Sequence, residues 1–378
     1  MRVSANPSST DQRLHIAIVA ASLRILGGQA VQAQRLLDGW NGDPDVLAWL
    51  VPINPVPRGT LAHLVRVKYV RTAVTQLLYW PLLVRELRRA DVVHVFSASY
   101  TSFLLSPLPA IIVGKLLGKR VIVHYHSGEA FDHLKRSPLA RWTLKRVDRN
   151  IVPSAFLRDV FAGFDIPADV VPNTIDLQRF AYRVRDPLAP RLLSTRNLEP
   201  LYNVACTLRA FRRIQARYPA AMLTVVGHGS EAARLQACAS DLGIRNVTFT
   251  GPVPPSEVHR YYGSADIYVQ TPSIDNMPNS VIEAFASGLP VVTTRVGGVP
   301  DILTHGVHGL LADDNDDEAI AAHVIHLLEH PDEARQMAAA ARDRCADGCW
   351  PRVREAWLAV YQSLARPIVP AYVHETAR

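Results

Sequence analysis

Short runs of β-branched and aliphatic residues alternate with longer helical stretches along this chain, and this alternation restricts its fold more than any other sequence feature. Strands that are joined through helices lie parallel, in sheets that the helices cover. A first series predicts strands at His15–Ala20, Val46–Val51, Asp91–Phe96, Val121–His124, Arg149–Val152 and Asp169–Val171. A second series predicts strands at Arg191–Thr195, Met222–Val226, Val247–Thr250, Asp266–Gln270, Pro290–Thr293 and Gly309–Leu311.

The two series are separated by a polar, proline-containing stretch from Asn173 to Pro190, which is typical of a linker. We therefore expect an α/β fold of two Rossmann-like, doubly wound parallel-sheet domains that face each other across a cleft. Ligands of such sheets bind beyond the carboxyl ends of the strands. The expected parts are a disordered tail (1–13), an N-terminal domain (14–172), the linker (173–190), a C-terminal domain (191–348), and a C-terminal helix returning toward the N-terminal domain, with a tail (349–378).

Helices are expected between the strands, and none of the apolar runs reads as a membrane span. The expected helices are Val31–Leu37, Leu61–Arg89, Thr101–Leu117, 201–217, 229–242, 255–263, 279–287, 316–329, 332–347 and Trp350–Leu364. The longest apolar run, Phe103–Gly114, contains two prolines and is too short to cross a bilayer. The polar start lacks the apolar core of a signal peptide, and the four cysteines have no metal-ligand or disulfide spacing. A cytoplasmic protein with reduced thiols is the expectation.

Positive charge is concentrated in the first half of the chain. Residues 1–172 contain 21 Lys and Arg against 12 Asp and Glu, a charge of +9, whereas the remainder contains 20 against 22, a charge of −2. A basic half fits an anionic partner: nucleic acid, an acidic membrane surface or a phosphorylated substrate. No recognised nucleic-acid-binding motif is present, so we expect no nucleic-acid partner. The basic, aromatic stretch Arg58–Arg89 fits either a surface for anionic lipids or a lipid-linked acceptor, or an amphipathic helix packed on the sheet.

The segment from Thr271 to Pro290 reads as strand, loop, helix, stop and strand. Asn276 can cap the helix, Pro278 suits its first turn because proline lacks an N–H, and Gly288 ends it. The free N–H groups at the helix start then form an anion site. Those expected to be free belong to Asn279, Ser280 and Val281.

Two acids flank this anion site. Asp275 precedes it, and Glu283 lies about one turn inside the helix. A diphosphate bound at the helix start would place a sugar near Asp275 and a ribose near Glu283, because carboxylates accept hydrogen bonds from hydroxyls. The alternative interpretation is a capped helix with two solvated acids.

This segment resembles the signature of the family-four retaining glycosyltransferases of GT-B fold (glycosyl transferases group 1), in which an acid, seven residues and a Glu precede a small-residue turn and Pro-Val-Val. Further stretches resemble the family in order: VVPNTIDLQRF (170–180), RNLEP (196–200), VVGHGS (225–230), VTFTGPVP (247–254), SADIYVQTPS (264–273) and VGGVPDIL (296–303). The resemblance covers nearly all of the second half and, more loosely, the first.

The resemblance implies a retaining, metal-independent transfer of a hexose from a UDP- or GDP-linked sugar to an acceptor hydroxyl, without a cofactor. It implies that the N-terminal domain binds the acceptor, a saccharide or lipid-linked intermediate of surface polysaccharide or glycoconjugate synthesis. The charge imbalance and the basic 58–89 stretch add peripheral contact with the inner face of the cytoplasmic membrane as an expectation. The implied catalytic residues are His126, Arg196, Asp275 and Glu283, and the implied donor-binding residues are Gly27, Gly28, Gly227, Val253, Asn279, Ser280 and Val281. A catalytically silent GT-B partner protein is the alternative.

Several positions leave alternatives open. His124 competes with His126 for the strand-end role, whereas His94 is expected to be structural, as are the acids of 313–317. Asp275 stands where the family usually has Glu. The family's diphosphate site also pairs its Arg with a Lys, and the expected position falls at Leu201 or Tyr202; no lysine occurs after residue 145, so a basic residue of the first domain is the expected substitute.

Overall fold

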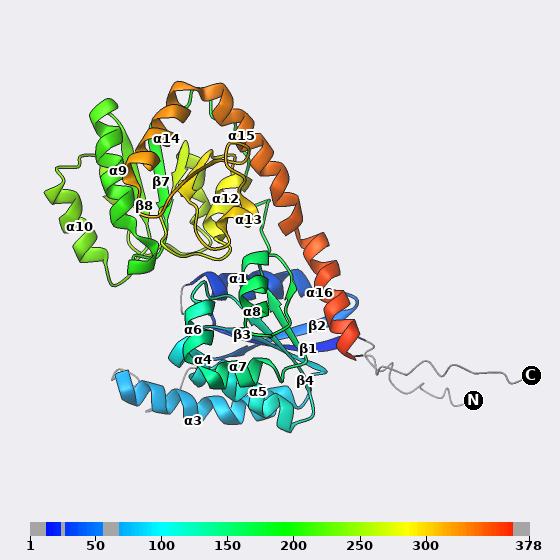
Figure 1. The fold of residues 1–378 in the computed structure, drawn as a ribbon. Helices are drawn as coiled ribbons and strands as arrows, with labels where there is room; N and C mark the ends of the chain where they lie inside the picture. Colours follow the sequence, from blue (N-terminus) through cyan, green and yellow to red (C-terminus); the bar gives the residue numbers. More distant parts are fainter. Residues whose placement is uncertain (1–12, 24–26, 56–67, 366–378) are drawn as a thin grey trace, which may run out of the picture.

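The computed structural model describes residues 13–23, 27–55 and 68–365, and only the backbone of Lys68 and Tyr69. The expected tail at 1–13, apart from Arg13, therefore lies outside the described residues, as do 58–67 of the basic stretch and 366–378 of the C-terminal tail. Two α/β domains lie one above the other, each built on a parallel sheet of six strands (Figure 1).

The first sheet has the order β2-β1-β3-β4-β5-β6 and only parallel pairs among its described strands. Its strands are β1 (Leu14–Ala20), β2 (Val46–Pro52), β3 (Val92–Ser97), β4 (Arg120–Tyr125), β5 (Arg149–Val152) and β6 (Asp169–Val170). The strand order reverses between β1 and β3, which opens a crevice at their carboxyl ends.

The second sheet has the order β12-β11-β10-β7-β8-β9, again with parallel pairs. Its strands are β7 (Arg191–Thr195), β8 (Met222–Val226), β9 (Val247–Phe249), β10 (Ile267–Val269), β11 (Val291–Thr294) and β12 (Leu310–Ala312). Its order reverses between β7 and β10. Every strand end in both sheets falls within one residue of its prediction, and the α/β fold class is confirmed.

Helices cover both faces of each sheet (Figure 1). Those of the first domain are α1 (Gly28–Trp40), α3 (Lys68–Leu87), α4 (Tyr100–Leu105), α5 (Pro107–Leu116), α6 (Ala130–Arg136), α7 (Pro138–Leu144) and α8 (Ala155–Ala162). The second domain has η1 (Pro200–Tyr202), α9 (Val204–Arg217), α10 (Ala232–Asp241), α11 (His259–Ser264), α12 (Asn279–Ala286), α13 (Val299–Ile302), α14 (Asp317–Glu329), α15 (Pro331–Arg344) and η2 (Cys345–Gly348).

Some predicted helices differ in detail: the one at 201–217 is divided at Asn203 into η1 and α9, and the one at 255–263 begins at His259. The stretch Thr101–Leu117 forms two helices, α4 and α5, which meet at Ser106. Pro107 is the first residue of α5, where its missing N–H is tolerated, and the residue before a proline is driven out of the helical region. Ser106 accordingly has φ −130°.

Two segments connect the domains. Residues 171–190 run between the sheets without helix or strand. The last helix, α16 (Trp350–Ala365), crosses from the second domain back to the first (Figure 1) and buries Val353, Trp357 and Tyr361 against the first sheet. Arg354 fixes it there by donating to Asp43 at 2.6 Å and to Asp45 at 2.6 Å.

Within the described part of the chain, none of the helices combines the length and apolar character that crossing a membrane requires. The four cysteines are free thiols.

Candidate active site in the interdomain cleft

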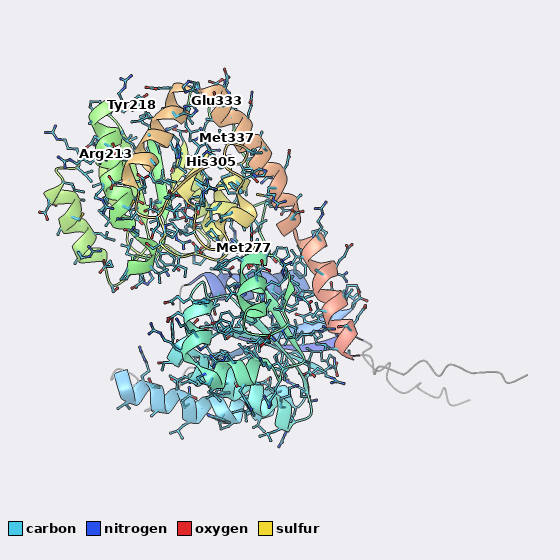
Figure 2. The ribbon with its side chains drawn as sticks, in the orientation of Figure 1. Arg213, Tyr218, Met277, His305, Glu333 and Met337 are labelled. Carbon is cyan, nitrogen blue, oxygen red and sulfur yellow. The ribbon has the colours of Figure 1, made fainter. Side chains whose placement is uncertain are left out.

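A cleft of about 840 Å³ separates the two domains, and its walls are the loops that follow the carboxyl ends of the strands. Met277, labelled between the two domains in Figure 2, belongs to its second-domain wall. Most of the predicted site residues line it: Gly27, Gly28, His126, Arg196, Gly227, Val253, Asp275, Asn279, Ser280 and Glu283. The structure thus brings together residues that are up to 256 positions apart in the chain.

Arg196 is held rigidly just after β7. Its Nη2 donates to Asp275 Oδ2 at 2.6 Å, and its Nη1 donates to Ser280 Oγ at 3.1 Å. The ring of Tyr202 covers the face of the guanidinium, with its centroid 4.0 Å from Cζ. Nε of Arg196 is buried and has no hydrogen-bond partner among the described residues. A buried donor of this kind is costly unless a ligand satisfies it.

Asp275 is as buried as its partner. Burial raises the pKa of its carboxyl, and the charge of Arg196 partly offsets this increase. Oδ1 also accepts from the N–H of Asn276 at 2.8 Å. The loop around Asp275 rests on Gly297, whose φ is 52° and where a Cβ would meet the carbonyl oxygen of Asp275 at 1.8 Å. That position can only be glycine, because a side chain would push the acid out of the site.

Glu283 has partners on both of its oxygens. Oε1 accepts from Nη2 of Arg35 at 2.6 Å, and Oε2 accepts from the hydroxyl of Tyr262 at 3.0 Å. Arg35 comes from α1 of the first domain and also donates to the carbonyl of Thr174 at 3.1 Å. The acid that was predicted to bind a ribose therefore already connects the domains.

The start of α12 differs from its prediction in two ways. Pro278 is the N-cap, and Asn276 does not cap the helix because its Oδ1 accepts from Ser154 Oγ across the cleft. The N–H of Val281 is not free, since it donates to the carbonyl of Pro278 at 3.1 Å, and the Val281 side chain is buried away from the cleft. The N–H groups of Asn279 and Ser280 have no partner in the described structure, so the anion site has two free donors rather than three.

A network of amides joins the two domains beside these donors. Gln32 Nε2 donates to Asn279 Oδ1 at 2.9 Å, and Asn173 Nδ2 donates to the same oxygen at 2.9 Å. Sequence reasoning did not identify Gln32 or Arg35. A signal was available: Gln29, Gln32 and Arg35 recur every three residues after Gly27-Gly28, which places them on one face of the helix.

Of the two competing histidines, only His126 lines the cleft. Burial lowers the pKa of His126 to about 3, so its imidazole is neutral at physiological pH. Its Nε2 is buried without a partner among the described residues. His124 lies in the core, where its Nδ1 pairs with His94 Nε2 at 3.2 Å, and His94 Nδ1 pairs with the Tyr361 hydroxyl of α16 at 2.8 Å.

The glycine turn that follows β8 packs against the backbone of Arg196. Gly227 has φ 148°, and a Cβ there would lie 2.0 Å from the carbonyl oxygen of Arg196. Only a glycine lets β8 end so close to the strand that carries the arginine. His228 and Glu129 also line the cleft.

Two of the acids of 313–317 lie at the start of α14, and Asp314 accepts from Ser273 Oγ at 2.9 Å. Asp316 Oδ1 accepts from the N–H of Ala319 at 2.8 Å, and Asp317 accepts from Arg209 and Arg213, each at 2.9 Å. Within the described residues, no three His, Cys, Asp or Glu side chains gather as metal ligands.

Both halves of the chain match known families. The family described as "Glycosyl transferases group 1" matches residues 183–344, and "Glycosyltransferase Family 4" matches residues 26–179. A GDP-mannose-dependent alpha-(1-6)-phosphatidylinositol monomannoside mannosyltransferase of Mycolicibacterium smegmatis is 29% identical over 77% of this chain and 83% of its own length. The amylovoran biosynthesis glycosyltransferase AmsK of Erwinia amylovora is 29% identical over 47% of this chain and 46% of its own.

Solved structures share the two-domain arrangement. Anabaena Alr3699/HepE, in complex with UDP and glucose, superposes with a TM-score of 0.73 at 15% identity, covering 93% of this chain and all of its own. Sucrose-phosphate synthase from Thermosynechococcus elongatus gives a TM-score of 0.73 at 19% identity, with 93% and 99% covered. At these identities the likeness is evidence of a shared fold.

Proposed function

Because the chain belongs to the group 1 glycosyltransferases and has their GT-B fold, we propose that it transfers a hexose from a UDP- or GDP-linked sugar to an acceptor hydroxyl, with retention of anomeric configuration. One observation carries the proposal above the others. Arg196, whose buried Nε has no partner among the described residues, lies beside the N–H groups of Asn279 and Ser280, which the described structure also leaves free, inside the cleft. This arrangement fits a diphosphate, because a guanidinium and a helix start both stabilise phosphate oxygens.

The remaining cleft residues have roles consistent with such a donor. Glu283 would accept from the ribose hydroxyls, and the backbone at Gly27 and Gly28 would approach the phosphates from the first domain. His126 and Asp275 would orient the sugar. A neutral His126 suits this task, because its unpartnered Nε2 can take part in one hydrogen bond to a hydroxyl without placing a cation beside the reacting carbon.

The chemistry would proceed on one face of the sugar. The bond between the anomeric carbon and the diphosphate oxygen breaks, and its electron pair leaves with the diphosphate. The acceptor oxygen forms the new bond to that carbon from the same side, while its proton passes to a departing phosphate oxygen. Arg196 and the start of α12 would stabilise the charge that grows on the leaving group. We propose metal independence because these groups supply positive potential there.

For the acceptor, we propose a saccharide or lipid-linked glycan of surface polysaccharide or glycoconjugate synthesis. The mycobacterial relative acts, by its name, on a phosphatidylinositol monomannoside, and the Erwinia relative serves amylovoran biosynthesis. Such an acceptor would reach the cleft from the first domain.

An outer surface of the first domain supports peripheral contact with an anionic membrane at the cytoplasmic face. Helix α3 buries Tyr79, Leu83 and Leu87 but exposes Leu77 (74%) and Trp80. The adjacent α5 exposes Leu116 (81%). The same two helices, with the turn that follows α3, also expose basic side chains: Arg71, Arg85, Arg88 and Lys115. Mixed apolar and basic surfaces favour anionic lipid interfaces. The buried face of α3 fits the interpretation as a packed amphipathic helix, and we propose the lipid-binding surface for its exposed face.

The deciding experiment incubates the purified chain with a panel of UDP- and GDP-hexoses and with lipid-linked and free saccharide acceptors. Mass spectrometry would identify the product, and proton NMR of its anomeric centre would give the configuration. We expect a glycoside with the donor's configuration. An inverted product would contradict retention. Nucleotide binding without transfer or donor hydrolysis across the panel would favour the silent partner protein.

A further inference from the structure

Tyr202 is fixed against Arg196 by its own turn. It ends η1, where its N–H donates to the carbonyl of Glu199 at 3.0 Å. The next residue, Asn203, adopts a left-handed conformation with φ 42°, and the carbonyl of Leu201 accepts from the N–H of Ser273 at 2.9 Å. The loop after β7 and the loop after β10 are therefore joined at this point. The ring of Tyr202 has little freedom to leave the guanidinium.

The stacked guanidinium still has donors to offer. Arginine has five N–H bonds, and Arg196 uses one for Asp275 and one for Ser280. Three remain, including that of the buried, unpartnered Nε. Stacking on an aromatic ring fixes the plane of a guanidinium, so these donors point in set directions before any ligand arrives.

The hydroxyl of Tyr202 also lacks a partner. The side chain lines the cleft, and its oxygen forms no hydrogen bond within the described structure. Burial raises the pKa of this hydroxyl, with the nearby Arg196 acting in the opposite direction, so the group keeps its proton at neutral pH. It is therefore an O–H donor placed beside the guanidinium.

The charged residues that line the cleft explain why a neutral donor matters for binding a diphosphate. Among the lining residues that the structure describes, the arginines are Arg35, Arg179 and Arg196, and the acids are Glu129, Asp275 and Glu283. Arg35 and Arg196 each pair with one of these acids at 2.6 Å. The described lining therefore carries no net formal charge, and a diphosphate gains little from unpaired cations. Oriented hydrogen-bond donors must supply the attraction instead.

We propose that Tyr202 is a donor-binding and positioning residue: its ring holds Arg196 in the plane that meets the diphosphate, and its hydroxyl donates to a diphosphate oxygen. This inference rests on the proposed function. It assigns to a neutral side chain the place where the family resemblance predicts a lysine. The site would then bind the diphosphate through oriented hydrogen-bond donors more than through net positive charge.

Calorimetry with UDP and GDP, and with UMP and GMP for comparison, tests the assignment. Tyr202→Phe keeps the ring and should weaken diphosphate binding about 10-fold, with a smaller effect on the monophosphates. Tyr202→Leu should weaken it further and also lower kcat, because Arg196 loses its stacked position. Tyr202→Lys should bind the diphosphate about as tightly as the unaltered protein but with a steeper dependence on salt, because dissolved ions screen the attraction of a cation for phosphate.

A second arginine–tyrosine pair provides the matched control. Tyr218, labelled at the end of α9 in Figure 2, lies away from the cleft, and its ring centroid is 5.5 Å from Arg217 Cζ. Tyr218→Phe should therefore leave the affinities for all four nucleotides unchanged. Unchanged diphosphate affinity in Tyr202→Phe would overturn the hydroxyl's role. Unchanged kcat in Tyr202→Leu would overturn that of the ring. No binding of UDP or GDP by the unaltered protein would refute the proposed function itself, and this inference with it.

Discussion

Arg35 and Glu283 form an ion pair of 2.6 Å across the interdomain cleft, 248 residues apart in the chain. The pair joins α1 of the first domain to α12 of the second, at the acid assigned to the ribose. Each carboxylate oxygen has two lone pairs, so Glu283 can accept from a ribose while it keeps Arg35 and Tyr262. A nucleotide bound there would lie between residues of both domains, at the acid that already joins α1 to α12.

Glu283→Ala should weaken nucleoside diphosphate binding by about 1.5–3 kcal/mol, the range for a hydrogen bond to a charged group. Asp275→Glu should cost much less, since it keeps a carboxylate that Arg196 can reach. Isothermal calorimetry would measure both. Glu333→Ala, on the exposed surface of α15 (Figure 2), is the matched control and should change nothing. Unchanged affinity in a folded Glu283→Ala protein would remove the ribose assignment.

Both sheets could be predicted because parallel strands are buried on both faces and read as continuous aliphatic runs. The cleft followed from the strand ends, which place Gly28, His126, Arg196 and Asp275 on facing loops. Partners across the cleft could not be predicted. Arg35 finds Glu283 only through the docking of two domains, a tertiary event that no local pattern encodes.

The two wrong predictions at the start of α12, its cap and the free N–H of Val281, also arise from a contact between the domains. Asn276 has the composition of a cap, but Ser154 of the first domain engages its side chain, and Pro278 caps instead. Because the cap lies two residues later than predicted, the N–H of Val281 falls within reach of the Pro278 carbonyl. Local propensity was overridden by a contact between domains.

Stability should fall as the pH falls below about 6.5. Burial lowers the pKa of His94 and of His126 to about 3 and that of His124 well below its usual value. The unfolded chain therefore binds protons that the folded chain excludes, so His94 and His126 each cost about 1.4 kcal/mol of stability per pH unit between about 6.5 and 3, and His124 acts in the same direction. Urea unfolding at pH 7.5, 6.5 and 5.5 should show the loss.

Two variants separate this cause from general acid sensitivity. His94→Gln removes one buried imidazole and should reduce the slope of stability against pH. His330→Asn changes an exposed histidine and should leave the slope unaltered. A stability that stays constant from pH 7.5 to 5.5 would contradict the neutral, buried cluster.

Membrane association should be weak and salt-sensitive. In flotation, the protein should rise with vesicles of phosphatidylcholine and phosphatidylglycerol, and less with phosphatidylcholine alone, because basic side chains attract anionic headgroups. Added salt should lower the recovery, because screening shortens the reach of these charges. Leu77→Ser combined with Leu116→Ser should reduce recovery. Val307→Ser, which alters an exposed apolar residue of the second domain, is the control. Equal recovery with both vesicle types would contradict binding of this surface to anionic lipids.

Turnover should persist after exhaustive EDTA treatment. The positive potential at the leaving group is assigned to Arg196 and the start of α12, neither of which a chelator removes. Product formation by dialysed enzyme, with and without added magnesium or manganese, would be compared. A loss of activity that either metal restores would overturn the assignment.

Arg196→Ala should have the largest effect on the rate. Its guanidinium is oriented on three sides, by Asp275, Ser280 and Tyr202, so in the proposed reaction it would meet the growing charge of the leaving diphosphate without rearrangement. Loss of one such preorganised donor costs about 10²–10³ in kcat. Arg196→Lys should recover only part of this, because an ammonium neither stacks as a plane nor donates in two parallel directions. Steady-state kinetics, with circular dichroism to confirm folding, would give these values.

Arg217 provides the matched control for the Arg196→Ala variant. Arg217 also lies over a tyrosine, with Cζ 5.5 Å from the Tyr218 ring, but it is on the outer end of α9. Arg217→Ala should therefore keep the full rate. In Arg196→Ala, Asp275 would also lose its partner while buried, so the double variant Arg196→Ala/Asp275→Asn, compared with Asp275→Asn alone, separates loss of the donor from the cost of an unpaired acid. If the double variant turns over at the normal rate, the leaving group is stabilised elsewhere, and Arg35 becomes the residue to test.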